Sequence, residues 1–463
     1  MKAGRHVLQV FLLFTILING NGCAALPNVS EVIEEAPLSH APRRISSSKG
    51  LLSPAMSKAI MNRLKRAGRP TDILERHAVV MESVTEAPLT NGNKVTLLAD
   101  GTATYAAMFK AIRRAKDHIN IESYIIEDDD TGRAFADLLL HKQAQGVQVH
   151  LVYDSLGSIK TPESFFQRLR DGGVGVVAFN PLNPTSDRDE WGLTHRDHRK
   201  ILIVDGMLAI VGGINISKVY SSNPFKRKHN ETTPIHWRDT DIQIEGPAVA
   251  ELQKLFRATW QAQKGPKLSD SNFFPAVQER GKALVRVVGS SPGESNRLPF
   301  IMYVSALSFA EYSIHMTHSY FIPDGQIIEA LSDAAQRGVD VKLILPGVSD
   351  SQLALHAQRH YYAGLLKSGV KIYEHGSSLL HAKTAVIDKV WSTVGSTNMD
   401  FLSLLHNDEV NAVILNRDFA AAMEKMFVSD LAGSRQIHWD DWKERPWLPR
   451  VREWFVNLFM QWL

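Results

Sequence analysis

The pattern of apolar and polar residues predicts two stretches of the chain with the same order of strands and helices. In each stretch, strand-like runs alternate with amphipathic helical runs. Strands that alternate with helices predict an α/β fold, here mixed sheets flanked by helices. The first stretch has expected helices at 106–116, 135–145 and 165–170 and strands at 119–126, 146–152 and 173–177; the second has strands at 312–321, 338–344 and 369–373 and helices at 327–336 and 361–367.

The two stretches keep a nearly constant offset in the sequence. Gly146 and Gly338, which open equivalent strands, are 192 residues apart, and the next pair of strand-opening glycines is 196 residues apart. A common βαβ pattern repeated by chance would not keep this offset. We therefore expect two lobes related by a pseudo-twofold axis, at residues 71–265 and 266–435.

The beginning of the chain has the order of a targeting segment. Lys2 and Arg5 precede an apolar run at 7–18, which is short for a membrane span and typical of a secretory signal. An uncleaved anchor helix is the alternative. We predict a signal peptide at residues 1–23 and a place outside the cytoplasm, in a bacterial envelope.

Cys23, the single cysteine of the chain, follows Gly22 at the end of this segment. The pair resembles a bacterial lipoprotein site, at which the cysteine carries the lipid. Such sites usually have Leu three residues before the cysteine, where this chain has Gly20, so ordinary cleavage near residues 23–25 stays open. A single cysteine also excludes an intrachain disulfide.

Segments of different composition flank the two lobes. Residues 24–70 are rich in Pro, Ser, Ala and charge and are predicted to be a tether with a short helix near 57–67. Residues 436–463 are predicted to form an amphipathic helix in a bilayer interface, with packing against its own domain as the alternative. Its apolar residues are Trp447, Leu448, Val451, Trp454, Phe455, Leu458, Phe459, Trp462 and Leu463, with Arg450, Arg452, Glu453 and Asn457 between them.

Composition narrows the function classes. The chain of 463 residues is 44% hydrophobic, which is enough for a large core. Its 52 Lys and Arg against 49 Asp and Glu leave a formal net charge of +3. This charge is too weak to argue for a nucleic-acid partner, and none is expected, whereas weak attraction to an anionic membrane surface is compatible with it.

The strongest chemical signal is a His-x-Lys motif that occurs twice. His198 and Lys200 are two residues apart on an expected strand and therefore share a face, as do His381 and Lys383. One copy could arise by accident on a surface strand, but two copies with the same continuation are specific. Each continues into an apolar run, an aspartate and a Gly-x-x-Asn segment: His198, Lys200, Asp205 and Asn215 in the first copy, and His381, Lys383, Asp388, Ser396 and Asn398 in the second.

These blocks resemble the His-x-Lys-x4-Asp signature of the phospholipase D superfamily, and the residues around them resemble bacterial cardiolipin synthases. The similarity covers roughly residue 90 to the end of the chain. One departure is Gly213, where many members carry Ser, so the first half-site is expected to bind phosphate less tightly. Further segments that carry the resemblance are 119–124, 146–149, 180–181, 237–241 and 246–249.

The resemblance implies a role for each site residue. His198 is expected to be the nucleophile and His381 the general acid, although the near symmetry of the half-sites leaves the reverse open. The orienting acids are expected to serve one histidine each, with a surface salt bridge to Arg238 as the alternative for Asp239. The expected set is His198, Lys200, Asp205, His381, Lys383 and Asp388 as the signature, Asn215, Ser396 and Asn398 at the phosphate, and Asp239 and Glu409 as the orienting acids.

The two signature aspartates are expected to differ from the rest of the set. Asp205 and Asp388 stand at an odd offset from the histidines, which points them away from the histidine face. We expect them to cap nearby backbone.

Elementary chemistry supports the same mechanism. A phosphodiester is an anion, and two lysines would neutralise it and the further charge of the transition state. One neutral imidazole can attack phosphorus, while the other protonates the leaving alcohol. The segment 195–198 could also be taken for a metal cluster, but the lysines already supply positive charge, so neither a metal nor a cofactor is expected.

The predicted function is a phosphatidyltransferase that makes cardiolipin from phosphatidylglycerol through a phosphohistidine intermediate. A hydrolytic phospholipase D or another exported phosphodiesterase is the alternative, because water competes with the lipid hydroxyl in the second step. A non-catalytic scaffold is disfavoured by the two intact motifs.

Overall fold

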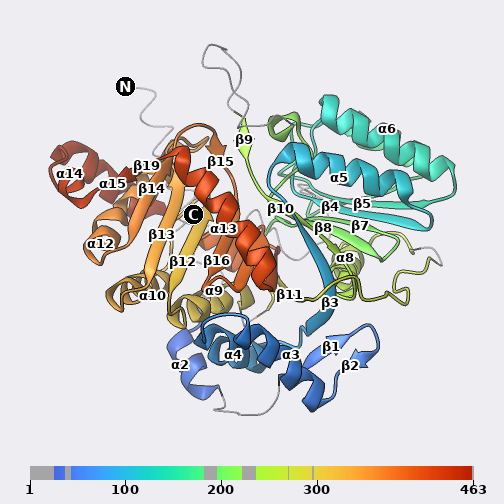
Figure 1. The fold of residues 1–463 in the computed structure, drawn as a ribbon. Coiled ribbons are helices and arrows are strands. Elements are labelled where there is room, and N and C mark those ends of the chain that lie inside the picture. Colours follow the sequence, from blue (N-terminus) through green and yellow to red (C-terminus); the bar gives the residue numbers. More distant parts are fainter. Residues whose placement is uncertain are drawn as a thin grey trace, which may run out of the picture.

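The chain folds into two α/β lobes that lie side by side, the first in blue to green and the second in yellow to red (Figure 1). The predicted signal peptide, with Cys23, lies outside the described residues, so its cleavage and lipidation stay predictions. The structure is a computed structural model that describes residues 26–36, 43–181, 195–221, 236–268, 271–294 and 297–460.

The first lobe is built on a mixed sheet with the strand order β6-β5-β4-β7-β8-β10-β3. The β6-β5-β4 part is parallel, and the pairings from β4 to β3 are antiparallel. The elements are β3 (Leu89–Leu98), α5 (Gly101–Arg114), β4 (His118–Ser123), α6 (Asp130–Ala144), β5 (Gln148–Asp154), α7 (Glu163–Asp171), β6 (Gly175–Phe179), β7 (Lys200–Val204), β8 (Leu208–Gly212), β10 (Asp241–Glu245) and α8 (Val249–Ala262).

The second lobe repeats this topology with the order β14-β13-β12-β16-β17-β18-β11. An additional strand, β19, pairs with the outer edge of β14, and β11 pairs with β3 to join the two sheets. The predicted two-lobed α/β fold is thus confirmed. The elements are β11 (Ala283–Ser290), α9 (Leu298–Ser308), β12 (Ser313–His318), α10 (Gly325–Gln336), β13 (Asp340–Pro346), α11 (Gln352–His360), α12 (Tyr362–Lys367), β14 (Lys371–His375), β16 (Lys383–Ile387), β17 (Trp391–Gly395), β18 (Glu409–Leu415), α13 (Arg417–Ala432) and β19 (Ser434–Ile437).

The backbone conformation explains why glycine recurs at these equivalent positions. Gly146, Gly173, Gly338 and Gly369 each follow a helix and have φ angles of 88°, 86°, 91° and 99°. Only glycine adopts this left-handed conformation without strain, and it ends a helix before the chain turns into a strand. The constant offset therefore records equivalent helix ends in the two lobes.

The strand that follows the first motif is buried on both faces. Ile201 and Ile203 pack with α8 and with the second lobe, whereas Leu202 and Val204 pack with α5 and α6. Burial on both faces explains why this segment is continuously apolar instead of alternating. The central core between the lobes contains the inward faces of both sheets together with α8 and α13.

The segment predicted to be a tether differs from that prediction. Its residues form α2 (Val29–Glu35), β1 (Ile45–Ser47), β2 (Gly50–Leu51) and α3 (Pro54–Arg66), which lie below the two lobes in Figure 1. Val29, Ile45, Met61 and Leu64 are buried in the core of the second lobe, and β1 pairs with β3. A few spaced apolar residues are enough to dock the segment, although its average composition is that of a linker. The short helix expected near 57–67 is α3.

The C-terminal region carries two further helices, α14 (Trp439–Lys443) and α15 (Trp447–Met460). The predicted amphipathic helix is α15, for which side chains are described as far as Asn457. Across the described ranges, no helix has both the length and the apolar character needed to cross a membrane.

Candidate active site

Both His-x-Lys motifs lie at the same place in their lobes, where the parallel strands end. Lys200 opens β7 opposite Ser123, the last residue of β4, and Lys383 opens β16 opposite His318, the last residue of β12. In sheets of this kind, ligands bind outside the carboxyl ends of the parallel strands. The local fold therefore places both motifs at a binding edge.

Each histidine takes its carboxylate partner from the other lobe. His198 Nδ1 lies 3.0 and 3.1 Å from the two carboxylate oxygens of Glu409, at the start of β18. His381 Nδ1 lies 2.6 Å from Oδ2 of Asp239, just before β10. Both imidazoles are buried. Because each takes its acid from the other lobe, they lie at the interface of the two lobes.

The backbone reinforces this exchange. The N–H of His198 donates to the carbonyl of Asp408 over 2.9 Å, and the N–H of His381 donates to the carbonyl of Arg238 over 2.8 Å. Each motif is thus hydrogen-bonded to the residue that precedes its own orienting acid. Main chain and side chain together set the position of each ring.

Burial lowers the pKa of both histidines and so favours their neutral forms in the empty site. Burial and the charge of Lys383 lower the pKa of His381 to about 4, against the opposing effect of Asp239. Burial also lowers the pKa of His198, against the opposing effect of Glu409. A carboxylate can only accept at Nδ1, so Nε2 of each neutral ring carries a lone pair.

The two lysines are buried beside the histidines, and the charge of Lys383 contributes to the pKa of Lys200. Burial lowers the pKa of Lys200 to about 7 against the opposing charge of Glu409, with the charge of Lys383 adding to the decrease. Burial lowers the pKa of Lys383 to about 8 against the opposing charges of Asp239 and Glu409. Each Nζ donates to the carbonyl of its own histidine. An anion that enters between them would favour the charged ammonium forms.

The two asparagines occupy equivalent positions and are each held from two sides. Asn215 Oδ1 accepts from the N–H of Ile125, and its Nδ2 donates to Tyr220 Oη. Asn398 Oδ1 accepts from Ser319 Oγ, and its Nδ2 donates to Ser403 Oγ. Because an amide nitrogen has two hydrogens, each side chain retains donor capacity beyond these contacts.

Ser396, which was expected at the phosphate, is hydrogen-bonded to an orienting acid. Its hydroxyl donates to Glu409 Oε2 and accepts the N–H of Val410 at 3.0 Å. The side chain therefore supports an orienting acid. The equivalent residue, Gly213, faces the carboxylate of Asp239, and a Cβ there would lie 2.3 and 2.5 Å from the two oxygens. The departure from Ser is thus required by space.

The two signature aspartates cap backbone, as their odd offset predicts. Asp205 Oδ1 accepts the N–H groups of Asp117 and His118 at 2.8 and 3.1 Å, where β4 begins. Asp388 Oδ1 accepts those of Tyr312 and Ser313 at 2.7 and 3.0 Å, where β12 begins. These contacts fix each motif strand to the parallel strand beside it.

Two buried arginines hold the orienting acids in place, and the surface salt bridge considered for Arg238 and Asp239 is not formed, since both residues are buried and Arg238 pairs with Asp430. Arg199 Nε donates to the carbonyl of Glu409 at 3.2 Å. Arg238 Nη1 donates to the carbonyl of Asp239 at 2.7 Å, and its guanidinium forms a two-point ion pair with Asp430 of α13 at 3.0 and 2.7 Å. Both arginines belong to the first lobe and reach into the second, so they tie the lobes together at the site.

Aromatic rings surround the two imidazoles. The ring of Tyr124 lies 5.0 Å from that of His198, and the rings of Trp237 and Tyr320 lie 4.9 and 6.3 Å from that of His381, centroid to centroid. Trp237 and Tyr124 belong to segments that carried the family resemblance, which was the available signal for them. The rings give the site apolar walls.

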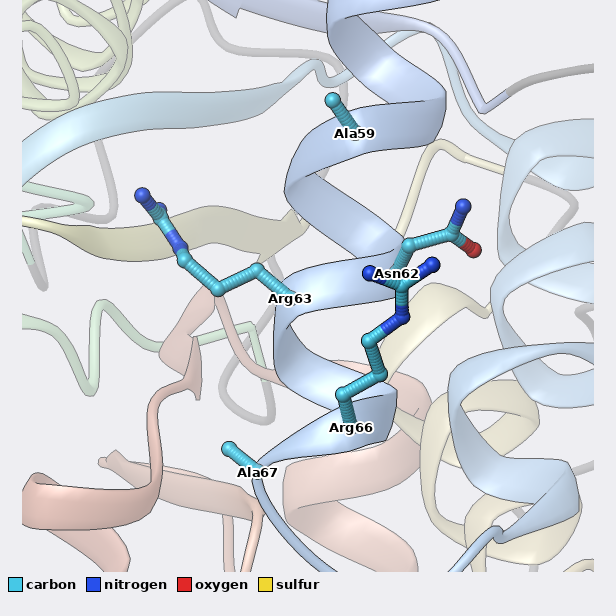
Figure 2. Close-up of a pocket in the computed structure, with 5 residues that line it drawn as sticks. All are labelled: Ala59, Asn62, Arg63, Arg66 and Ala67. Carbon is cyan, nitrogen blue, oxygen red and sulfur yellow. The ribbon is translucent and has the colours of Figure 1, made fainter.

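A pocket of about 460 Å³ lies elsewhere, on one side of α3. Figure 2 shows its lining side chains, Ala59, Asn62, Arg63, Arg66 and Ala67, all of which come from this one helix. None belongs to either motif block, so the pocket is separate from the candidate active site. No group of His, Cys, Asp and Glu that could hold a metal occurs among the residues that the structure describes.

The chain is similar to known proteins over most of its length. Residues 108–260 and 303–431 match the family described as cardiolipin synthase, PLD-like domain. The chain is 33% identical over 396 residues to a cardiolipin synthase of Alkalihalophilus pseudofirmus, covering 84% of this chain and 76% of the relative. It is 36% identical over 359 residues to cardiolipin synthase A of Pseudomonas fluorescens, covering 77% and 72%.

A solved structure shares the fold at low sequence identity. The phosphatidylserine synthase of Haemophilus influenzae superposes with a TM-score of 0.59 at 14% identity, over 86% of this chain and 97% of the other. At this identity the likeness concerns the fold alone. The family match, together with the relatives, establishes that the chain belongs to the cardiolipin synthase family of phospholipase D-like proteins.

Proposed function

We propose that this protein is a phosphatidyltransferase that joins two molecules of phosphatidylglycerol into cardiolipin and releases glycerol. The observation that carries the proposal is the pair of buried imidazoles, each oriented at Nδ1 by an acid of the opposite lobe. The names of the relatives supply the product, cardiolipin.

In the proposed first step, Nε2 of His198 attacks the phosphorus of one phosphatidylglycerol. The new N–P bond replaces the P–O bond to the headgroup glycerol, and protonated His381 donates its proton to the departing oxygen. The negative phosphodiester favours protonation of His381, whose pKa is low in the empty site. Glycerol leaves, and a phosphatidyl group remains on His198.

In the proposed second step, the neutral ring of His381 removes the proton from a hydroxyl of a second phosphatidylglycerol. The oxygen attacks phosphorus, the N–P bond breaks, and both histidines return to their starting states. Lys200 and Lys383 would neutralise the phosphate oxygens throughout, and the amides of Asn215 and Asn398 would donate hydrogen bonds to them. No cofactor or metal takes part in this sequence of bonds.

Transfer requires that the lipid hydroxyl outcompete water, which is present at roughly 55 M. The buried position of the histidines and the aromatic walls support this, because an apolar site restricts water and retains the lipid. An enzyme at a membrane surface also meets a dense supply of lipid hydroxyls.

The test is lipid mass spectrometry of purified enzyme incubated with phosphatidylglycerol vesicles. We expect cardiolipin and free glycerol in equal amounts. If phosphatidic acid dominates even in lipid-rich vesicles, the enzyme is a hydrolase and the transferase proposal fails.

We also propose that the protein is exported to a bacterial envelope and is held to a membrane by lipid on Cys23, by the C-terminal helix, or by both. The basis for the first anchor is the residue order at positions 1–23. Mass spectrometry of the mature N-terminus tests it, because an unmodified chain that starts at Met1 would exclude both cleavage and lipidation at Cys23.

A further inference from the structure

The helix α15 is oriented in the opposite way to an ordinary surface helix. Its polar residues Glu453 and Asn457 are turned toward the protein, with 4% and 8% of their surface exposed. Its apolar residues are turned outward: Trp447 and Trp454 are 71% and 53% exposed, and Val451 is also exposed. An amphipathic helix usually buries its apolar face. The apolar face of α15 therefore requires another explanation.

Specific contacts hold the helix in this orientation. Arg445 forms a two-point ion pair with Glu453 at 2.8 and 3.1 Å. Tyr361 Oη donates to Asn457 Oδ1 at 2.9 Å. Val456 adds an apolar contact with the buried cluster around α11. Asn457 and Val456 thus anchor this face to the second lobe, Arg445 fixes Glu453 from the segment before the helix, and the outward direction of the tryptophans follows.

The charges around the exposed face fit an anionic surface. Trp447, Leu448, Val451 and Trp454 form one stripe along α15. At about 100° per residue, the exposed Arg450 and Arg452 stand about 100° to either side of this stripe. Arginines that flank an aromatic stripe are the pattern of a helix lying in the interface of an anionic bilayer, with its rings at headgroup level.

The stripe is connected to the candidate active site. Val456 of α15 contacts the cluster formed by Ile322, Ala354 and Ala357, and Tyr320 packs against the same cluster. The ring of Tyr320 lies 6.3 Å, centroid to centroid, from that of His381. The helix and Tyr320, at the wall of the catalytic site, therefore pack against the same small cluster. In Figure 1, α15 follows α14 along the second lobe.

We infer that the stripe Trp447, Leu448, Val451 and Trp454 docks on a bilayer of anionic phospholipid and holds the catalytic site beside its lipid substrate. The docking rests on α15 and its contacts, whereas the identity of the lipid that is then processed rests on the proposed function. The partner is a membrane surface, because the flanking arginines match anionic headgroups and the helix packs against the same cluster as Tyr320 of the catalytic site.

Fluorescence quenching tests the docking on the full chain, whatever other anchor the chain carries. Vesicles of phosphatidylglycerol with brominated acyl chains should quench part of the tryptophan emission of the wild type. The variant Trp447→Phe/Trp454→Phe should lose that part, because the quenched rings are the ones removed. Quenching that is absent in the wild type, or unchanged in the double variant, would overturn the inference.

Activity on two lipid formats gives a second readout. The triple variant Trp447→Ser/Val451→Ser/Trp454→Ser should lose about 10-fold or more of its activity on phosphatidylglycerol vesicles and keep its activity on short-chain, monomeric phosphatidylglycerol. The control Met207→Ser/Val428→Ser, which changes exposed apolar residues elsewhere, should match the wild type in both formats. Equal activity of the triple variant and the wild type on vesicles would contradict the docking.

The two flanking arginines can be tested separately from the apolar stripe. Arg450→Gln/Arg452→Gln should weaken binding to phosphatidylglycerol vesicles by about 10-fold and leave binding to phosphatidylcholine vesicles unchanged. If the triple variant instead converts a self-associated protein into a monomer without a change in quenching, the stripe is a contact between copies and the inference is wrong. Absence of cardiolipin from the wild type in both lipid formats would contradict the proposed function and leave the quenching result standing.

Discussion

The two half-sites contain the same kinds of residue but support their histidines differently. The first imidazole, His198, is held by the longer acid Glu409, which in turn receives the hydroxyl of Ser396. The second, His381, is held by the shorter acid Asp239, which packs against Gly213 with no space for a Cβ. The acid and the residue that faces it have therefore changed together, and each pair keeps a carboxylate at its histidine.

The arginines that tie the lobes are also distributed unequally. Arg199 lies inside the first motif, where the second motif has Ala382, and Arg238 precedes the acid Asp239, where Asp408 precedes the acid Glu409. Both guanidinium groups therefore come from the first lobe. Pseudo-symmetry therefore holds for the reacting groups, whereas the residues that support them differ between the two halves.

The largest effect is expected from removing either imidazole. His198→Ala and His381→Ala should each reduce cardiolipin formation by about 10⁴-fold or more, because one ring forms the covalent bond and the other moves the proton. The double variant should be no worse than either single variant, since the rings act as one unit. Rates from radiolabelled phosphatidylglycerol measure this. Full turnover by His381→Ala would show that one half-site suffices.

Neutralising the orienting acids should produce the next largest effect. Asp239→Asn and Glu409→Gln should each lower kcat by about 10²- to 10⁴-fold, since the amide no longer stabilises the imidazolium and can select the wrong tautomer. We expect decreases of similar size for the two variants, because each acid has one further support besides its histidine: the N–H of Thr240 at 2.7 Å for Asp239 and the hydroxyl of Ser396 for Glu409. Circular dichroism should show an unchanged fold. Unchanged kcat in both variants would contradict the orienting roles.

Changing the residue that faces each acid tests how much that support contributes to catalysis. Gly213→Ala should reduce kcat by about 10²-fold, because its Cβ would displace the Asp239 carboxylate from His381. Ser396→Ala removes one hydrogen bond to Glu409 and should cost about 10-fold or less. Steady-state kinetics on both variants, with thermal unfolding as a control, test this order. A milder effect for Gly213→Ala than for Ser396→Ala would show that the crowding at Asp239 is relieved without loss of geometry.

The smallest expected effect is a shift in pH dependence. Lys200 and Lys383 have pKa values lowered to about 7 and about 8, so they are charged below these values and lose charge as pH rises through them. kcat/KM for the anionic lipid should therefore decline between about pH 7 and pH 8. The variant Lys200→Arg stays charged and should move this decline to higher pH. An unmoved decline would mean that Lys200 does not set it.

The sequence was sufficient for the lobes and for the two motifs because these features are local. Period-two and helical patterns predict the strands and helices, and Gly146 and Gly338 mark equivalent helix ends. The spacing within His-x-Lys places both side chains on one face of a strand, whatever the rest of the chain does. The odd offset of Asp205 likewise predicts its cap on the start of β4.

Features that depend on how distant segments pack could not be predicted in this way. Which acid serves which histidine follows from the docking of the lobes, and Ser396 reaches Glu409 because β17 and β18 are neighbours. The segment at residues 24–70 reads as a tether by average composition, but Val29 and Ile45 are fully buried. The orientation of α15 likewise depends on two polar contacts that no periodicity contains.

The central claim is that the two half-sites share one covalent intermediate. The measurement that tests it most directly is intact-protein mass spectrometry after an alkaline quench of the full-length enzyme during turnover of phosphatidylglycerol, followed by fragmentation to locate the adduct. We expect one phosphatidyl group per chain, carried by His198, and none in His198→Ala. An adduct on His381 would reverse the assignment of the two rings. Turnover without any adduct, or with one on each histidine, would contradict a single shared site.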